Sequence, residues 1–525
     1  MKSAIALFLP LTASLLSPLA APPARAAVEI DVGIVQRFGD RTGERLTLAS
    51  LSGDSLTLEF LGGDGQPQTV TASSVQIDSI AQPQGEPILQ EWVVLSDHAT
   101  FETAEASALA WQAKGIETEV TQPERWQVWA KRDVYNTPVL RRLLLDNLTE
   151  QGETGPRLQS QVLRALPRLS FVVAGYRYNR ESLRITSRNR RIRVQDSEGT
   201  RLYGGDLRVQ GNAYGDFTLI NEVPIETYLR GVVPHEIGPS APYNAVEAQT
   251  VIARTYALRN LRRFQADGYE LCATVHCQVY KGLSGTVERA DTAIRATRGL
   301  VLTYNNELVD ALYSSSSGGI TSAFTDTWDG EERPYLQPRV DAIANLWNLD
   351  QQPLNNETAI RRFLAQQQGF NGTQSALFRW QKTESLSEST AHFKRYLTRR
   401  QHPLANFTRI VRMEVTARSR SGRVLVLAVE TDRGVVELEK NEARSAFGPP
   451  RSTLFYIDPV LNANQQLTGY RFVGGGFGHG AGLSQFGAYT LAQQGWRYDR
   501  ILNFYYPGTQ IQPLNESIVY YQAEP

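Results

Sequence analysis

The stretch GVVPHEIGPSAPYNAVEAQTVIARTYALRN, residues 231–260, predicts a long buried helix. The helix is expected to begin after Pro242, where Asn244 and Glu247 have the spacing of an N-cap residue and its partner in a capping box. Apolar residues then recur on one helix face until the Ala-Asp-Gly of 266–268 ends the pattern. The recurring positions are Val251, Ile252, Thr255, Leu258 and Leu261.

Glu236 lies just before this helix, in a segment that we expect to be a loop. An ionised carboxylate is costly to bury, and apolar surroundings raise the pKa of a glutamate. A carboxyl that stays protonated near neutral pH can act as a general acid. An ordinary ion pair with Arg230 or Arg254 is the alternative that involves no catalysis. The apolar neighbours of Glu236 are Val232, Val233, Pro234 and Ile237.

The composition of the 525 residues makes some classes of partner improbable. Lys plus Arg and Asp plus Glu number 54 each, so the formal net charge is zero. Without a strong electrostatic field, neither nucleic acid nor an anionic membrane is an expected partner. A chain of this length should form about three domains.

Residues 1–26 have the pattern of a secretory signal peptide. Lys2 supplies a positive charge, AIALFLPLTASLLSPLA an apolar core, and the Ala-Arg-Ala of 24–26 a cleavage site of small residues. We therefore expect export to the periplasm or cell wall, with an uncleaved membrane anchor as the alternative. No later stretch is long and apolar enough to span a bilayer.

Alternating apolar and polar residues between Gly, Asn and Ser turns predict strands in residues 27–88, a small β unit, and again in 169–221. Residues 89–152 follow the order strand, helix, strand, strand, helix. This order, with WVVLSDHATFETAEASALAWQAKG, resembles a SPOR domain, a module that binds peptidoglycan strands without peptides. A generic α+β domain is the alternative. Trp126 and Trp129 are three residues apart on one strand, so we expect them to face opposite sides of the sheet.

Three further motifs resemble the signature of the stage II sporulation protein D family, which includes the amidase enhancers. They read VPIETYLRGVVPHEI, NAVEAQTVIARTYALRN and GGGFGHGAGLSQFGAY, in that order. The resemblance implies a catalytic domain over residues 165–515, with an insertion at about 341–460 that should hold two surface helices and an antiparallel sheet. The expected fold is thus α+β and β-rich, with a small N-terminal β unit, a SPOR-like module and a larger mixed catalytic domain around the long motif helix.

The same resemblance implies a peptidoglycan lytic transglycosylase that cleaves glycan strands between N-acetylmuramic acid and N-acetylglucosamine, preferring strands without peptides. The family's catalytic glutamate corresponds to Glu236, which would act first as acid and then as base. One carboxyl would suffice, because the muramic acid 6-hydroxyl closes a 1,6-anhydro ring without water. Two other functions stay open. One is a non-enzymatic peptidoglycan-binding protein that stimulates a cell-wall amidase; the other is a two-carboxylate hydrolase that uses Asp326, Asp329, Glu331 or Glu332.

Two segments are expected to line the glycan groove. The hydroxyl-rich LYSSSSGGITSAFTDTWDG, residues 312–330, suits sugar hydroxyl and N-acetyl groups. The glycine-rich GGGFGHGAGLSQFGAYTLAQQGW, residues 474–496, lets backbone approach a sugar and should start a helix after Ser484 that stops at Gly495. It lacks the lysine of a P-loop, so we do not expect nucleotide binding. The predicted groove residues are Ser317, Thr321, Trp328, His479, Ser484 and Gln485, supported from the helix by Gln249 and Arg254.

Cys272, His276 and Cys277 place three soft metal ligands within six residues. Some family members bind a structural zinc ion with this segment, but the histidine that precedes the first cysteine in them is missing here. His235 and His479 are the candidates for a fourth ligand. A disulfide between the two cysteines, which an oxidising compartment permits, and two free thiols are the alternatives.

Overall fold

The computed structural model of the chain describes residues 28–41 and 43–522, so the predicted signal peptide lies outside the described residues. The fold is α+β and rich in strands, as expected. Among the described residues, no helix combines the length and the apolar character needed to cross a bilayer.

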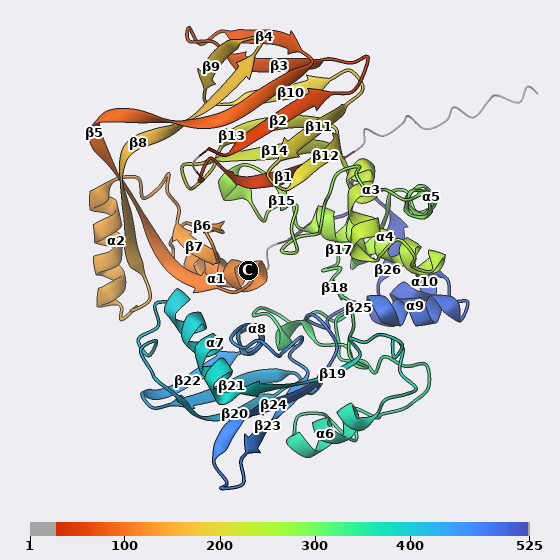
Figure 1. The fold of residues 1–525 in the computed structure, drawn as a ribbon. Helices are drawn as coiled ribbons and strands as arrows, with labels where there is room; N and C mark the ends of the chain where they lie inside the picture. The colour runs from red at the N-terminus through yellow and green to blue at the C-terminus, as the bar shows by residue number, and fades with distance from the viewer. Residues whose placement is uncertain (1–27, 42, 523–525) are drawn as a thin grey trace, which may run out of the picture.

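Two large sheets dominate the N-terminal half (Figure 1). One has the strand order β15-β1-β14-β13-β10-β3-β4. The other follows β12-β11-β2-β5-β7-β6, with β8 pairing to β5 and β9 to β8. The strands are β1 Glu29–Phe38, β2 Arg45–Ser50, β3 Leu56–Leu61, β4 Pro67–Ala72, β5 Ser74–His98, β6 Thr118–Thr121, β7 Trp126–Ala130, β8 Arg157–Val173, β9 Tyr176–Arg180, β10 Leu183–Ser187, β11 Arg191–Asp196, β12 Gly199–Gly204, β13 Asp206–Gly211, β14 Phe217–Pro224 and β15 Leu271–Cys272.

Residues 27–88 do not form a separate small β unit, which corrects that prediction. Strand β1 pairs with β14 and β15, β3 pairs with β10, and β2 pairs with β11. The N-terminal strands thus complete their backbone hydrogen bonds with strands that come more than a hundred residues later. Local alternation predicts a strand correctly, but it does not identify the strand's partner.

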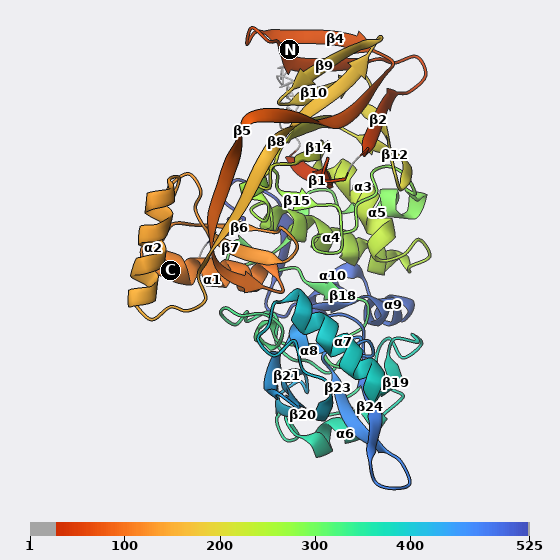
Figure 2. The same cartoon turned by 60° about the vertical axis from the view of Figure 1, so that its left-hand side comes forward.

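The order strand, helix, strand, strand, helix is confirmed for the next part of the chain. It consists of the end of β5, α1 Phe101–Ala113, β6, β7 and α2 Pro138–Glu150. The long strands β5 and β8 pair from the main sheets out to this module (Figure 2). Trp126 packs against Phe101 and Phe264, and Trp129 packs against Trp92 and Tyr214. Both tryptophans are buried, with 2 % of Trp126 and 1 % of Trp129 exposed, and the likeness to a SPOR domain stays a prediction.

Helix α4, Tyr243–Arg259, is the centre of the helical layer and is buried from Ala245 to Arg259. It packs against the other helices of the layer, which explains why it is buried on all sides. The helix begins at Tyr243, directly after Pro242, as expected, but its N-cap is Pro242, two residues before Asn244, and no side chain caps it, so the predicted capping box is wrong. The other helices are α3 Ile225–Glu236, α5 Glu288–Ala296, α9 Gln485–Gln493 and α10 Tyr498–Tyr505, with the 3₁₀ turn η1 Gln265–Asp267.

Short strands bring the two predicted groove segments together. Strand β18, Tyr313–Ser314, lies in the hydroxyl-rich segment and pairs in parallel with β25, Leu483–Ser484, in the glycine-rich one. Helix α9 follows β25, and the Ser484 hydroxyl caps it by accepting the Gly487 N–H, as predicted. A three-stranded sheet nearby comprises β16 Leu300–Tyr304, β17 Glu307–Leu308 and β26 Gln510–Pro513.

The insertion contains the two helices and the antiparallel sheet that its sequence predicts, with the hairpin turning at Ser421 and Gly422. Two clusters of buried apolar residues stabilise it, separate from the main core. It lies at the lower end of both views (Figures 1 and 2). Its elements are α6 Glu357–Ala365, β19 Arg379–Ser385, α7 Leu386–Arg399, β20 Ile410–Arg418, β21 Val424–Thr431, β22 Gly434–Glu439, α8 Asn441–Ser445 and β23 Phe455–Leu461. The 3₁₀ turn η2 Phe324–Asp326 precedes it, and β24 Leu467–Gly475, which pairs with β19 and β23, follows it.

Candidate active site

A cleft of about 630 Å³ opens where the N-terminal module, the helical layer and the insertion meet. It contains Glu236 together with residues from both predicted groove segments. The lining residues that the argument uses are Glu102 and Trp126 from the module, Glu236, Tyr256, His276 and Val279 from the helical layer, Tyr313, Trp328, His479 and Gln485 from the groove segments, and Asn441, Arg444 and Ser445 from the insertion.

Glu236 is the last residue of α3 and not part of a loop, which corrects the prediction. Ile225, Tyr228, Leu229, Val232 and Val233 form one buried face at helical spacing, so the apolar run that precedes the glutamate is itself a helix. The helix end places the carboxyl at the cleft.

The carboxyl of Glu236 is held by hydrogen bonds from neutral groups. Its Oε1 accepts the Val279 N–H at 2.6 Å, and the Tyr313 hydroxyl bonds to the side chain. Tyr313 in turn accepts the Gln278 Nε2–H at 3.2 Å. Burial raises the pKa of Glu236, and the bonds from Val279 and Tyr313 partly oppose that shift. These surroundings favour a carboxyl that keeps its proton to a higher pH than an exposed glutamate does.

No described cation forms an ion pair with Glu236. Arg230 pairs instead with Asp291, at 2.9 Å. The buried Arg254 binds both carboxylate oxygens of Glu226, at 2.9 and 2.7 Å. The simple ion pairs considered from the sequence are therefore not formed.

Helix α9 holds the end of α3 against α4. The Gln485 Nε2 group donates to the Glu236 backbone oxygen at 3.1 Å and to Gln249 Oε1 at 3.2 Å. The Tyr489 hydroxyl donates to the Ile237 carbonyl. Three sequence motifs thus meet at one point, and Gln485 and Gln249 hold the backbone that carries the glutamate.

His479 and Trp328 form one wall of the cleft, with their ring centroids 5.0 Å apart. Burial, with added repulsion from Arg444 and Arg423, lowers the pKa of His479 to about 3. The neutral ring accepts the Ala481 N–H on Nδ1 at 3.1 Å, so its proton resides on Nε2. Trp328 is 5 % exposed, and it packs its ring on Phe324.

Three predicted groove residues are buried away from the cleft lining, which corrects their placement, and the predicted supporting residues Gln249 and Arg254 also lie outside it. Ser317 donates through Oγ to the buried Asp341 at 2.6 Å, and its N–H donates to Ser484 Oγ. Thr321 Oγ1 donates to the Gln337 carbonyl at 3.1 Å. Arg254 is fully buried in its pair with Glu226. A hydroxyl suits a sugar, but it equally satisfies the backbone of a tightly folded loop, and that role prevails here.

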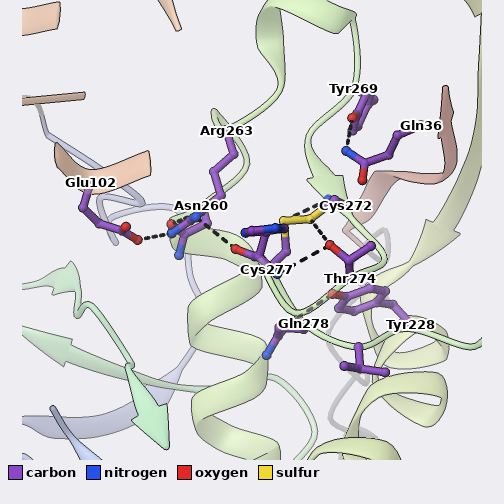
Figure 3. Close-up of a disulfide and its surroundings, with 12 residues drawn as sticks. Gln36, Glu102, Tyr228, Asn260, Arg263, Tyr269, Cys272, Thr274, Cys277 and Gln278 are labelled. Carbon is purple, nitrogen blue, oxygen red and sulfur yellow. Dashed lines mark hydrogen bonds and ion pairs between the residues drawn. A yellow bond between two sulfur atoms is a disulfide. The ribbon is translucent and has the colours of Figure 1, made fainter. Parts of the chain in front are cut away.

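The structure also identifies two lining residues that the sequence analysis missed. Glu102, in the first turn of α1, pairs with Arg263 (Figure 3). Arg444, on α8 of the insertion, lines the cleft near His479. Both come from parts of the chain without a catalytic motif, so no local signal marked them. The acids proposed as second carboxylates do not line the cleft. Two of them bind elsewhere: Asp326 accepts a hydrogen bond from Ser421, and Asp329 pairs with Lys440.

Cys272 and Cys277 are joined in a disulfide, with their Cα atoms 5.6 Å apart (Figure 3). The bridge closes the loop that leads directly to Gln278 and Val279, the segment in contact with the Glu236 network. Sulfurs in a disulfide are not thiolates, so the oxidised loop does not fit a zinc ion. The described residues also contain no cluster of three or more His, Cys, Asp or Glu side chains arranged to hold a metal. Zinc binding stays a prediction for the reduced chain.

Residues 213–304 match the family described as "Stage II sporulation protein". Over 305 residues the chain is 29 % identical to the amidase enhancer of Bacillus subtilis (strain 168), covering 54 % of this chain and 40 % of that protein. It is 25 % identical over 320 residues to stage II sporulation protein D of the same organism, covering 58 % of this chain and 79 % of that protein. Residues 213–304 are thus similar to the stage II sporulation protein family, and more than half of the chain is similar to an amidase enhancer and to a stage II sporulation protein D.

Within this family match lie α3, α4, Glu236 and the disulfide loop. Residues 322–482 match a second family, "Domain of unknown function (DUF8618)". That match includes Trp328, Arg444 and His479. A protein of Brachyspira hyodysenteriae described as uncharacterized is also 25 % identical over 320 residues, covering 60 % of this chain and 74 % of that protein.

Proposed function

We propose that the protein is an exported peptidoglycan lytic transglycosylase that cleaves strands of N-acetylmuramic acid and N-acetylglucosamine, preferring strands without peptides. One observation carries the proposal. Glu236 is a largely buried carboxyl to which no described cation is paired, at the wall of a cleft of about 630 Å³ that also holds His479, Trp328 and Gln485. Similarity to the stage II sporulation protein family and to an amidase enhancer, together with a disulfide of the kind typical of oxidising compartments, supports an extracytoplasmic cell-wall role.

In the proposed reaction, Glu236 first donates its proton to the oxygen of the glycosidic bond, so that the bond from muramic acid C1 to this oxygen breaks. The N-acetylglucosamine side leaves with a free 4-hydroxyl. The 6-hydroxyl oxygen of the same muramic acid then bonds to C1 and gives its proton to Glu236. The acid is restored, and the new end is a 1,6-anhydro sugar. No water is consumed.

A two-carboxylate hydrolysis is less well supported. Among the described residues that line the cleft, the second carboxyl is Glu102, and Arg263 pairs with it. The Arg263 guanidinium donates to Oε1 of this carboxyl, one of the two oxygens that would have to activate a water molecule. Glu236 is thus the lining carboxyl that is suited to hold and return a proton.

Stimulation of a cell-wall amidase is the second candidate function. It is favoured by the similarity to a protein that is named an amidase enhancer. The same cleft would then bind glycan without cutting it. The two candidates predict different chemistry for the purified protein on its own, because only the transglycosylase makes anhydro ends without a second enzyme.

The decisive experiment incubates the purified mature chain with peptide-free glycan strands and identifies the new ends by mass spectrometry. We expect 1,6-anhydromuramic ends, and a loss of at least about 100-fold in rate for Glu236→Gln, which retains an acceptor for the Val279 N–H. Glu247→Gln is the matched control, because Glu247 lies on α4 outside the cleft lining and should cost little activity.

Absence of new ends with the active-site acid intact would refute the enzyme and favour the amidase-stimulating role. New reducing ends in place of anhydro ends would indicate hydrolysis. Anhydro ends that persist in Glu236→Gln would show that another residue is the acid.

A further inference from the structure

We propose that Arg444 binds the free lactyl carboxylate of N-acetylmuramic acid, and that this contact selects strands from which the peptide has been removed. The inference rests on the proposed function in one respect, namely that the cleft binds glycan. It assigns the selection to a side chain of the insertion, outside the match to the sporulation protein family.

Arg444 is a guanidinium without a partner in the described structure. It lines the cleft from α8, and no described residue forms a hydrogen bond, ion pair or ring contact with its side chain. Burial lowers its pKa, and no neighbouring carboxylate opposes that shift. By contrast, the buried Arg254 and Arg263 each have a glutamate partner. A desolvated and unpaired guanidinium is costly, and the cost is offset when an anion binds.

The surroundings of Arg444 favour an anion over a cation. Arg423 lies close enough to repel its charge, and two nitrogens of Arg423, Nε and Nη1, are buried without a hydrogen-bond partner. His479 is neutral at physiological pH. Glu102 is paired with Arg263, and Glu236 is the carboxyl whose pKa burial raises. No free carboxylate in the cleft lining therefore competes with an incoming anion for this arginine.

A second polar group beside Arg444 also lacks a partner. Asn441, one helical turn earlier on α8, lines the cleft, and its Oδ1 oxygen is buried without a hydrogen bond. An acceptor three residues from an unpaired arginine, on the same helix face, suits a ligand that presents an anion and an N–H or O–H close together. N-acetylmuramic acid has this combination, because its lactyl group on C3 is adjacent to the acetamido group on C2.

The carboxylate distinguishes the two forms of the glycan. In a strand that carries peptides, the lactyl carboxyl is part of an amide bond and has no charge. Once the peptide is removed, the same group is an anion that a guanidinium can bind with two parallel hydrogen bonds. The cleft would then act after a reaction that hydrolyses the amide between muramic acid and peptide, because only that class of reaction exposes the carboxylate.

The test measures binding, and it uses the full mature chain with Glu236→Gln so that no substrate is cut. The probes are a muramic acid-containing tetrasaccharide with free lactyl carboxylates and the same compound with each carboxylate converted to a methylamide. We expect the free acid to bind at least about tenfold more tightly, and Arg444→Gln to remove this difference by weakening the binding of the acid alone. Arg444→Lys, which keeps the charge and loses the planar fork, should recover part of it.

Arg433→Gln is the matched control, because this exposed arginine lies on the turn between β21 and β22 of the same insertion, outside the cleft lining. It should leave the preference unchanged. Equal binding of acid and methylamide by the chain with Arg444 intact would overturn the proposal without any need for a folded Arg444 variant. Equal losses for both probes in Arg444→Gln would also overturn it. A failure to form anhydro ends would refute the transglycosylase alone, since the binding difference does not depend on cleavage.

Discussion

Replacing Arg254 with methionine tests whether a single buried charge pair anchors the helix that supports the site. Arg254 is fully buried in α4 and donates to both oxygens of Glu226, at 2.9 and 2.7 Å. A third bond, 3.0 Å long, goes to the Leu300 carbonyl. Removing the arginine leaves Glu226 with the Gly299 N–H but without a counter-charge. Breaking one partner of a buried pair costs about 3–5 kcal/mol, so we expect a loss of this size in the free energy of unfolding.

The assay is urea unfolding of the oxidised chain, followed by tryptophan fluorescence. Arg230→Met is the control, since Arg230 makes a similar two-bond pair with Asp291 but its side chain is 34 % exposed. An exposed pair contributes only about 0.2–1 kcal/mol. Replacing Arg254 and Glu226 together by apolar residues should cost less than the sum of the single changes. Equal losses for Arg254→Met and Arg230→Met would refute the reasoning, because burial would then have no influence on the value of the pair.

Two further predictions concern the surroundings of the acid. Tyr313→Phe removes a hydrogen bond that lowers the pKa of Glu236. The pKa of Glu236 should therefore rise further, and the high-pH limb of the kcat/KM profile should move to higher pH. The control is Tyr256→Phe, which removes a cleft hydroxyl that has no hydrogen bond to Glu236 and should leave the profile unchanged. An unchanged profile in Tyr313→Phe would contradict the assigned contact. Replacing Cys272 and Cys277 with serine should lower the free energy of unfolding by about 2 kcal/mol, measured in urea, as expected for a short closed loop. After dialysis against zinc, one ion bound to each reduced wild-type chain would support the zinc prediction, and a metal-free chain would refute it.

Local patterns in the sequence predicted elements better than partners. The end of α9 at Gly495, the hairpin at Ser421 and Gly422, and the order of elements around α1 all follow from turn residues and periodicity. The pairing of β1 with β14 and β15 could not be predicted, because the alternation of a strand is the same whichever neighbour it has. The helical spacing of α3 was present in the sequence, and the structure continues this helix through Pro234 to Glu236, where a loop was expected.

At the site, the sequence singled out Glu236, which the structure places in the cleft, but not all of its surroundings. The cleft contains Glu236, Gln485, His479 and Trp328. Each of these residues could be picked out from the sequence because it lies in a motif or an unusual segment. Ser317 and Thr321 have the chemistry of sugar ligands, yet the loop's own backbone uses their hydroxyls. Arg444 and Glu102 carry no local signal. Their position depends on how the insertion and the N-terminal module fold against the helical layer, and this is a property of the tertiary structure alone.

The pairing of the first strand has a consequence for how the chain folds during its synthesis. Gly33 faces Ile220 on one side and Cys272 on the other, and Glu236 acquires its contact with Gln485 only from a still later segment. In a chain that is made from its amino end, β1 can therefore pair with both neighbours only after Cys272 has been synthesised, and the sheet cannot close before then. The surroundings of Glu236 are therefore complete only after Gln485 has been synthesised and α9 has packed against the end of α3.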